Sequence, residues 1–446
     1  MPFYSLCILQ TNMPKPVKYM VGATKREVYK PSQQACPPVE ALPRYYYVQP
    51  LQNTPNAWTG SQVYADFEVP ANTGVMTEAT LRFQLSFSGS GKLPSLPPTP
   101  FWVDHVEVYI GSDLVETVWK HDIYNEEIAF RGFQDLLNVA VADPTSATEG
   151  YSIYNCGLNG TSTAPADQTL QELVLNSSGN DYWFLNIPSC MRSAKPYVRG
   201  FQSRIKFRVY FANTLDLMGG GQAVSLRESI LIVEEASTDP QTIAELERAH
   251  RQSTVDYTVL VRNRVQQTFA GGQISNGNDI QIYLRGFKNK SAGVVVIATD
   301  SSAFNQSSSV TMNDRYEASI IQLLDAQNNK ITERLPVEWL ESYVFADATG
   351  SASATQFNHT VRTTVVLPFS ADFKTSITKG CSYGGFRFTT LEQLVLNYAG
   401  TWNSSSGSDV VPQGIAGQTG TVIITATSYD YGHITVSSGR HSFRME

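Results

Sequence analysis

A run at residues 380–384, GCSYG, is the one match to a catalytic sequence pattern, G-x-S-x-G. In α/β-hydrolases this pattern places a nucleophilic serine on a strained turn between a strand and a helix, with the acid and histidine later in the chain. Here the residues that follow, FRFTTLEQLVL, have β character, and His433 and His441 lie in strand-like or terminal sequence. We therefore interpret the run as a glycine-rich turn.

A second stretch, SFSGSGKLP at 86–94, is similar to a phosphate-binding loop but lacks two of its required residues. Ser86 stands where the pattern needs glycine, and Leu93 replaces the Ser or Thr that follows the lysine. The proline-rich sequence after it cannot begin the helix whose N-terminus holds the phosphate. We reject a nucleotide site here.

Two pairs of adjacent acids, Glu126–Glu127 and Glu234–Glu235, raise the question of a glycosidase. Such enzymes need two carboxylates that converge on one bond. Adjacent residues of a strand point to opposite faces, so neither pair alone supplies them. A pair assembled from distant parts of the chain stays open at this point.

Histidine and cysteine spacings predict no metal or disulfide framework. The histidines form no HxH or HExxH pattern, and the cysteines form no CxxC pattern. These residues are His105, His121, His250, His359, His433, His441, Cys7, Cys36, Cys156, Cys190 and Cys381. We therefore predict no catalytic residue, no cofactor-binding residue and no metal ligand in this chain.

Aromatic residues near the start of the β region allow a sugar-binding face, although core and domain contacts explain them better. They are Tyr45, Tyr46, Tyr47, Trp58 and Tyr64.

Composition indicates a large β protein with extensive contact surfaces. The chain has 446 residues, of which 42% are hydrophobic, 11% aromatic and only 16% charged, with a net charge of −7. This length favours two domains, and the negative charge argues against a general nucleic-acid coat or sequence-specific nucleic-acid binding. The first residues lack the basic and apolar regions of a signal peptide, and no apolar run reaches 18 residues.

Residues 1–44 are predicted to form an extended basic arm. They contain seven prolines, and six Lys or Arg against two Glu give a net charge of +4. Since the whole chain carries −7, the remainder carries −11. Proline at this density prevents regular structure, so such an arm orders only against partners, and a disordered tail is the alternative interpretation.

From residue 45 onward, the order of strand-like segments occurs twice. RYYYVQP, ADFEVPANTG and TLRFQLSF correspond to VDYTVLVRN, IYLRGFKNK and GVVVIATD, and later segments continue the match. Residues 45–236 and 254–446 are nearly equal in length, at 192 and 193 residues. We predict two copies of one β domain with long loops, including 142–181 and 401–420.

Residues 237–253, STDPQTIAELERAHRQS, separate the two copies and predict a helix. Pro240 suits the first helical position, and Ile243, Leu246 and His250 form one thin apolar stripe. A helix this short is stable only when it is docked. We predict a helical connector whose stripe lies on a surface or in the seam between the domains.

Two equal β halves, long loops, a helical connector and a basic arm resemble the double jelly-roll major capsid proteins of tailless double-stranded-DNA viruses. That lineage includes adenovirus hexon and the coat proteins of membrane-containing phages and large eukaryotic DNA viruses. The resemblance covers about residues 45–446 and depends on element order, because the family has no diagnostic motif. It implies an all-β fold of two tandem eight-stranded jelly-roll β-sandwiches joined by a short α-helix, with apical loops and an N-terminal arm.

The resemblance also implies a non-enzymatic structural role. Three chains are expected to form a pseudo-hexagonal homotrimer that tiles an icosahedral shell, beside neighbouring capsomers, penton and minor capsid proteins. The arm is expected to contact an internal membrane, minor proteins or the genome. The protein is expected in the virion, assembled inside the host cell without a signal peptide. The alternatives are a carbohydrate-binding or glycan-cleaving β-sandwich protein and a minor vertex or spike virion protein.

Overall fold

The structure, a computed structural model, describes the β framework of the chain. The described residues are 43–51, 63–88, 91–92, 103–126, 150–152, 156–158, 174–175, 180–211, 223–236, 240–269, 279–300, 318–337, 339–340, 364–373, 376–377, 384–398 and 422–446. The predicted arm up to residue 42, the loop at 401–420 and most of the loop at 142–181 lie outside these ranges.

The first half of the chain forms two main antiparallel sheets. Its strands are β1 (Arg44–Val48), β2 (Val63–Glu68), β3 (Val75–Ser88), β4 (Gly91–Lys92), β5 (Val103–Ile110), β6 (Asp113–Trp119), β7 (Gly150–Ser152), β8 (Cys156–Leu158), β9 (Val174–Leu175), β10 (Asn180–Asn186), β11 (Ile205–Phe211) and β12 (Ala223–Ala236). One sheet has the order β1-β12-β3-β10-β8-β7 and the other β2-β11-β5-β6, while β4 pairs with β9. Short helices follow β6 and β10: α3 (Lys120–Asn125), α5 (Cys190–Ala194) and the 3-10 helix η5 (Val198–Gly200).

The second half repeats this arrangement. Its strands are β13 (Thr254–Phe269), β14 (Asp279–Tyr283), β15 (Lys290–Asp300), β16 (Ala318–Leu324), β17 (Leu335–Pro336), β18 (Val365–Pro368), β19 (Phe386–Arg387), β20 (Gln393–Tyr398), β21 (Val422–Ser437) and β22 (Arg440–Met445). The sheets run β13-β21-β15-β18 and β14-β20-β16-β17, with β19 added to β15 and β22 to β21.

The two halves share one strand order, which is the order of a jelly roll. The eight main strands are numbered 1 to 8 along the chain in each half. In the first half they are β1, β2, β3, β5, β6, β10, β11 and β12, and in the second β13, β14, β15, β16, β17, β18, β20 and β21. In both halves one sheet then has the order 1-8-3-6 and the other 2-7-4-5. In each half the first strand pairs with the last, as Arg44 with Glu235 and Thr254 with Ser437 show. The predicted all-β fold with two jelly rolls is confirmed, and so are the strand correspondences read from the sequence.

Alternation of residue type explains how each sheet faces its core. Strand β11, IKFRVYF, buries Ile205, Phe207 and Val209, whereas Lys206 and Arg208 between them are only partly buried. Successive side chains of a strand point to opposite faces, so this pattern places one apolar face against the partner sheet.

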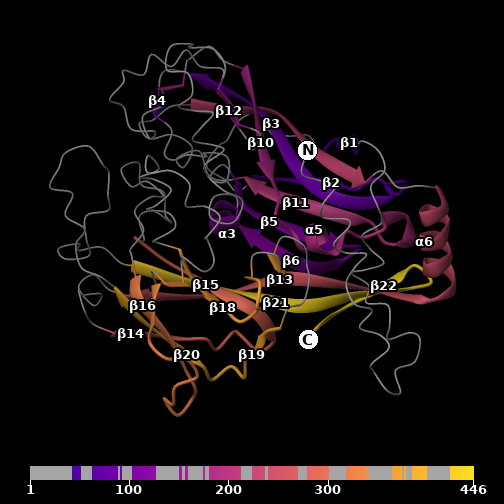
Figure 1. The fold of residues 1–446 in the computed structure, drawn as a ribbon. Coiled ribbons are helices and arrows are strands. Elements are labelled where there is room, and N and C mark those ends of the chain that lie inside the picture. Colours follow the sequence, from indigo (N-terminus) through magenta and orange to yellow (C-terminus); the bar gives the residue numbers. More distant parts are fainter. Residues whose placement is uncertain are drawn as a thin grey trace.

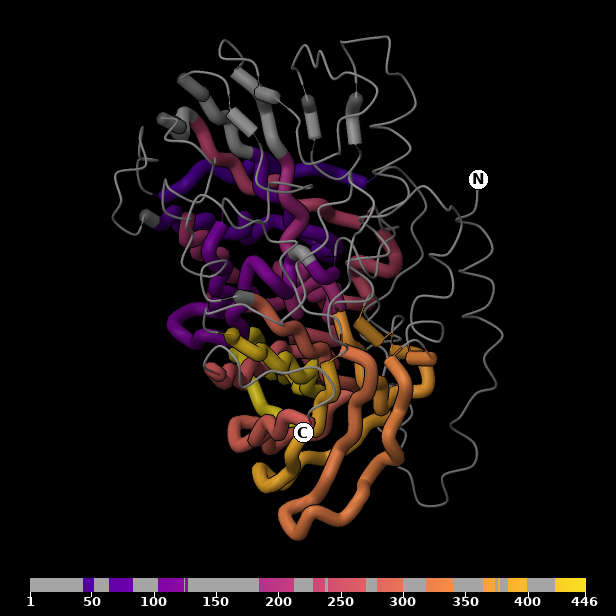
Figure 2. Tube along the Cα trace, turned by 90° about the vertical axis from the view of Figure 1, so that its left-hand side faces the viewer, coloured from indigo at the N-terminus to yellow at the C-terminus, as the bar shows by residue number. Residues whose placement is uncertain are grey.

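The four sheets stack as layers, seen from top to bottom in Figure 1. The sheet containing β1 and β12 is outermost, followed by the sheet of β2, β11, β5 and β6. The sheet of β13 and β21 comes next, and that of β14, β20 and β16 lies at the other end. In the view turned by 90°, the indigo-to-magenta first half again lies against the orange-to-yellow second half (Figure 2). Each half is thus a sandwich, and the two sandwiches lie with unlike sheets facing each other.

Hydrophobic packing extends across the boundary between the halves. One cluster of buried side chains lies wholly within the second sandwich, around Ile282, Leu323 and Leu394. The other contains the core of the first sandwich together with side chains of β13, β15, β18 and β21, including Val295 and Tyr429. The sheet of β13 and β21 therefore has packed side chains on both of its faces.

A helix, α6 (Pro240–Gln252), joins β12 to β13, as predicted for the connector. Leu246 and His250 are buried and Ile243 is partly buried against Tyr197, so the predicted stripe is confirmed. Gly200 lies directly under the ring of His250, where a Cβ would come within 2.2 Å of Cδ2, and this close approach requires glycine. Within the described ranges, α6 and the other helices are too short or too polar to cross a membrane.

Candidate functional site: the seam between the sandwiches

The described parts of the phosphate- and nucleophile-like stretches belong to strands or lead into them. Residues 380–383, with Ser382, lie outside the described residues, and Gly384 leads into strand β19 instead of a helix. Within 86–94, strand β3 runs to Ser88 and Gly91–Lys92 forms β4, so the lysine lies on a strand. The strand expected after the GCSYG run is confirmed.

The pair Glu234–Glu235 separates as expected from strand geometry. Glu235 points into the first sandwich, where its Oε2 accepts hydrogen bonds from Tyr46 (2.8 Å) and the backbone amide of Gly74 (2.7 Å). Glu234 lies on the opposite face and accepts a bond from Thr77 at 2.9 Å. Glu126 lies in the seam, while Glu127 is outside the described residues.

The remaining candidate residues are dispersed. Tyr45, Tyr47 and Tyr64 are exposed, and Trp58 and His359 lie outside the described residues. The described histidines have separate partners, such as Asp104 for His105, Tyr257 for His250, Glu446 for His433 and Asp113 for His441. Over the part of the chain that the structure describes, no three His, Cys, Asp or Glu side chains gather as metal ligands would.

The most concentrated polar chemistry is an ion cluster in the seam, where Arg262 of β13 reaches the first sandwich. Its Nη1 lies 2.6 Å from Oε1 of Glu116 on β6, and its Nε donates to Oε1 of Glu126, after α3, at 2.8 Å. Tyr429 of β21 donates to the same oxygen of Glu126 at 3.1 Å. The second oxygen of Glu116 accepts the backbone amide of Cys190 at 2.6 Å.

These charges are almost fully buried, because the side chains of Arg262, Glu116 and Glu126 are at most 5% exposed. Burial raises the pKa of Glu126 to about 7, although Arg262 opposes this shift. For Arg262, burial favours the neutral form, but Glu126 and Glu116 outweigh it and hold its pKa well above the ordinary value. The guanidinium of Arg262 thus forms ion pairs with two buried carboxylates.

The cluster is built to hold two sheets together. Glu116 and Glu126 converge on Arg262, but both belong to the first sandwich, so they are not a pair from distant parts of the chain. Both oxygens of Glu116 and Oε1 of Glu126, however, are occupied by Arg262, Tyr429 and a backbone amide, and the two side chains are at most 4% exposed. A glycosidase needs its two carboxylates beside an accessible substrate, with room for water or a covalent intermediate. We conclude that the cluster is a structural ion pair network.

Further hydrogen bonds fasten the seam on either side of the cluster. Thr427 of β21 donates to Asp122 of α3 at 3.0 Å, and the amide of Leu260 donates to Ser193 of α5 at 3.3 Å. At the connector, the hydroxyl of Tyr257 accepts the amide of Tyr197 at 3.1 Å and also contacts Nε2 of His250 at 2.7 Å. Burial lowers the pKa of His250, which keeps it neutral in this contact.

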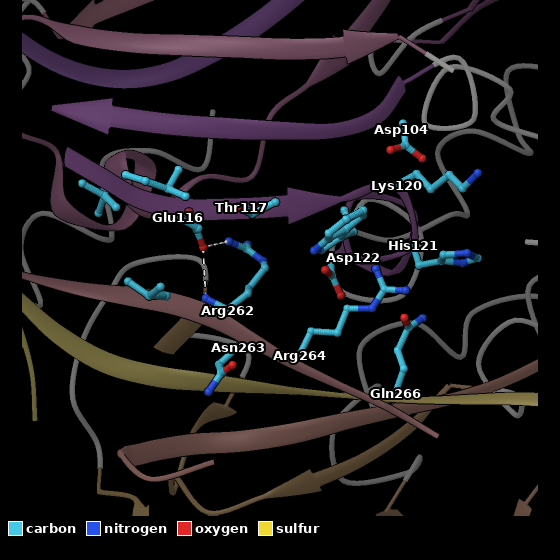
Figure 3. Close-up of a pocket in the computed structure, with 14 residues that line it drawn as sticks. Asp104, Glu116, Thr117, Lys120, His121, Asp122, Arg262, Asn263, Arg264 and Gln266 are labelled. Atoms are coloured by element: carbon cyan, nitrogen blue, oxygen red, sulfur yellow. Dashed lines mark hydrogen bonds and ion pairs between the residues drawn. The ribbon is translucent and has the colours of Figure 1, made fainter. Parts of the chain in front are cut away.

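Beside the ion cluster, the seam opens into a pocket of about 620 Å³ between β6, α3 and β13. Figure 3 shows Lys120, Asp122 and Asp104 of the first sandwich facing Arg264 and Gln266 of the second. The guanidinium of Arg264 lies 4.7 Å from the centre of the Trp119 ring, and burial lowers its pKa. Its lining carries both acidic and basic side chains: Asp104, Glu116 and Asp122 with Lys120, Arg262 and Arg264.

Sequence reasoning did not single out Arg262 or Glu116. The available signal was a charge inside an otherwise apolar strand, as in VDYTVLVRNRV and LVETVW. A charge that a sheet buries needs a charged partner, so such positions indicate contact with another element. The partner itself, 146 residues away, could not be identified from that signal.

Removing the arginine should weaken the seam strongly. Arg262→Ala leaves two buried carboxylates without their cation, and we expect a loss of about 3–5 kcal/mol in the free energy of unfolding. Urea denaturation would measure it. Arg334→Ala is the matched control, because Arg334 makes a two-pronged but exposed pair with Asp279 (3.0 and 2.6 Å), whose loss should be about 1 kcal/mol or less. Equal losses in the two variants would contradict the role of Arg262.

Glu126 should make the stability of the seam depend on pH. Its pKa rises from 4.5 to about 7 on folding, so the folded state binds the proton more tightly and stability falls as pH rises between these values. We expect the free energy of unfolding of the native protein, relative to Glu126→Gln, to fall by on the order of 3 kcal/mol across that range. Thermal and urea unfolding at several pH values would measure it, and parallel curves for the two proteins would exclude the effect.

Comparison with known proteins identifies structural relatives only. No protein-family model and no curated protein matches the sequence. Among solved structures, the chain is similar to VP54 of PBCV-1, fitted into a reconstruction of the virophage Sputnik, with a TM-score of 0.61 and 12% identity over 91% of this chain and 97% of that chain. It is similar to a chain of the PBCV-1 virus capsid, with a TM-score of 0.62 and 11% identity over 91% and 97%.

A third similar structure is the Faustovirus major capsid protein, with a TM-score of 0.52 and 8% identity over 97% of this chain and 94% of that chain. At identities of 8–12%, the likeness concerns the fold. It extends over both sandwiches and nearly the full length of each relative. The predicted likeness to double jelly-roll proteins is therefore confirmed at the level of the fold: this chain folds as a double jelly roll.

Proposed function

We propose that this chain is the major capsid protein of an icosahedral virus and forms pseudo-hexagonal homotrimeric capsomers. The observation that carries the proposal is the repetition of one jelly roll within a single chain, with the two copies joined by buried ion pairs and a shared hydrophobic cluster. Three such chains supply six similar wedges, which is the number needed for a hexagonal outline. The similar solved structures include a virus capsid chain and a major capsid protein, which agrees with this function.

The physical properties of the chain suit a shell subunit. Jelly rolls pair nearly all their strand edges and make stiff blocks. The buried ion cluster and shared hydrophobic cluster prevent the two blocks from moving as independent units. A low charged content of 16% leaves surfaces that can be covered by neighbours without a large desolvation penalty.

The domain division proposed for this function follows the sequence. Residues 45–236 form the first jelly roll, 237–253 the connector and 254–446 the second, with residues 1–44 as an arm, although β1 already begins at Arg44. The arm carries +4 against −11 for the rest, so it suits acidic partners such as a genome, a membrane surface or minor capsid proteins.

The role proposed is structural, with no enzymatic activity, and the partners are other capsid components. Neighbouring capsomers, penton and minor proteins would contact the sides of the trimer. Assembly would take place inside the host cell and yield a virion-borne protein. In this role the buried carboxylates of the seam serve rigidity, and the apical loops provide the variable outer surface.

The mass of the purified protein in solution tests the proposal. We expect a stable particle of three times 49.2 kDa by light scattering, with a roughly hexagonal outline in negative-stain images. The trimer follows from the need to complete six wedges from two per chain. A monomer that binds glycans would instead support a carbohydrate-binding β-sandwich protein and overturn the capsid proposal.

Deletion of residues 1–40 tests the role of the arm. The deletion spares all described strands, so trimers should form with unchanged thermal stability. Shell assembly should be lost, because the arm is proposed to connect capsomers to their partners. The matched control replaces Lys15, Lys18, Lys25 and Arg26 with glutamine, which removes charge but keeps length. Normal particles from the truncated protein would refute the role.

A further inference from the structure

The pocket of about 620 Å³ beside the ion cluster reaches from the protein surface into the seam, with β6 and α3 on one side and β13 on the other (Figure 3). Leu114, which lines it, is 48% exposed, whereas Asp122 in the same lining is only 3% exposed. Its volume falls within the range of sites that hold small organic molecules. The lining residues therefore indicate which kind of molecule would fit.

The carboxylate of Asp122 has one oxygen left to bind. Its Oδ1 accepts a hydrogen bond from Thr427 at 3.0 Å, whereas its Oδ2 is buried and has no hydrogen-bond partner among the residues that the structure describes. Buried polar atoms are nearly always hydrogen-bonded. An unpaired buried oxygen on the wall of a pocket thus points to a donor on a bound molecule.

Arg264, on the other wall of the pocket, is held in place by a row of rings. Its guanidinium lies 4.7 Å from the centre of the Trp119 ring, and the centre of that ring lies 4.7 Å from the centre of the His105 ring. His105 in turn stacks on Tyr210 at 4.2 Å. These rings are direct cross-strand neighbours on β11, β5 and β6, so each fixes the next. An arginine that packs on a fixed ring loses little conformational freedom when it binds a ligand.

Acidic and basic side chains of the lining balance each other. With histidine counted as neutral, the lining holds three acids and three bases, so its net charge is zero. Arg262 and Glu116 neutralise each other as an ion pair at 2.6 Å. The groups that remain are Asp104, Asp122, Lys120 and Arg264. A charged ligand would leave one charge of this partly buried set unmatched, which is unfavourable. The balance therefore favours a neutral ligand.

A neutral ligand must still supply both donors and acceptors to this lining. Asp104 and Asp122 only accept hydrogen bonds when they are ionised, whereas Lys120 and Arg264 only donate them. A hydroxyl group does both, so adjacent hydroxyls can bridge an acid and a base at the same time. An apolar molecule would offer no hydrogen bond to these side chains. A compact molecule with several hydroxyl groups meets all these conditions.

We propose that the seam pocket binds a neutral sugar, whose hydroxyl groups donate to Asp122 and Asp104 and accept from Arg264. This binding activity is additional to the proposed role in a shell and does not depend on trimer formation. Because the pocket is built from β6, α3 and β13, it exists only when the two sandwiches are held together. A bound sugar would therefore also stabilise the seam.

Saturation-transfer NMR and calorimetry with the purified full-length protein test the proposal. The probes are neutral hexoses, deoxyhexoses and N-acetylhexosamines, each as the free sugar and as its methyl glycoside. We expect at least one of them to bind at a single site in each chain. Binding of the methyl glycoside would identify the ligand as the terminal unit of a glycan, whereas binding of the free sugar alone would identify it as a soluble monosaccharide.

Arg264→Met should weaken this binding by about tenfold or more, because it removes hydrogen bonds from a charged donor while its unbranched side chain still covers Trp119. Asp104→Asn, at a side chain that is 33% exposed, should weaken it several-fold. Arg285→Met is the matched control, because Arg285 also lies over a ring, 5.1 Å from the centre of Tyr283, but does not line the pocket. This variant should bind the sugar as tightly as the native protein.

Circular dichroism and thermal unfolding check that each variant is folded. Absence of binding by all of the sugars would overturn the proposal and leave the pocket as a site for water. Binding of inorganic phosphate or methylammonium in place of sugars would also overturn it, because the site would then take a charged ligand. Equal sugar affinities of the native protein, Arg264→Met and Asp104→Asn would place the binding outside this pocket. None of these results alters the capsid proposal, which the mass in solution tests separately.

Discussion

The contact of Arg262 with Glu116 and Glu126 is the constraint on which the relative placement of the two sandwiches depends. Three buried charges are stable only when their partners are held at hydrogen-bond distance, since an unpaired buried ion is very unfavourable. The contact is therefore specific in a way that apolar packing alone is not. A hydrophobic seam tolerates small slips, whereas a slip of one residue here would separate Arg262 from both carboxylates. Rigid alignment of unlike sheets follows from this requirement.

The rigid attachment of the two sandwiches to each other explains why a chain with a repeated domain can act as one building block. Within each sandwich, the pairing of first and last strands closes the main sheet. Between sandwiches, the connector helix is fixed by Leu246 and His250, and the ion cluster lies deeper in the seam. A subunit that must present the same outer faces to every neighbour gains from having no internal hinge. The buried polar groups of the seam thus hold the two sandwiches in one fixed arrangement.

The fold could be predicted from the sequence because it depends on local patterns. Alternation in segments such as β11 marked the strands, Pro240 and the stripe of Leu246 and His250 marked the helix, and the repeated order gave the two jelly rolls. The seam could not be predicted, because it depends on pairs such as Arg262 with Glu116 that are 146 residues apart. Glu126 was considered in the sequence because it is adjacent to Glu127, whereas its partner in the structure is Arg262 of the other sandwich. Spacing along the chain carries no information about such contacts.

Pairing of the first strand with the last also sets an order of events during synthesis. The first sandwich cannot complete its main sheet until β12 has left the ribosome, because β12 lies between β1 and β3. Once β12 has emerged, that sandwich can fold while the second is still being translated. The connector helix, however, docks partly through Tyr257, which belongs to β13. The nascent chain can therefore hold a folded first sandwich on which Leu246 already packs, whereas the contact of His250 with Tyr257 and the seam can form only after the second half has emerged.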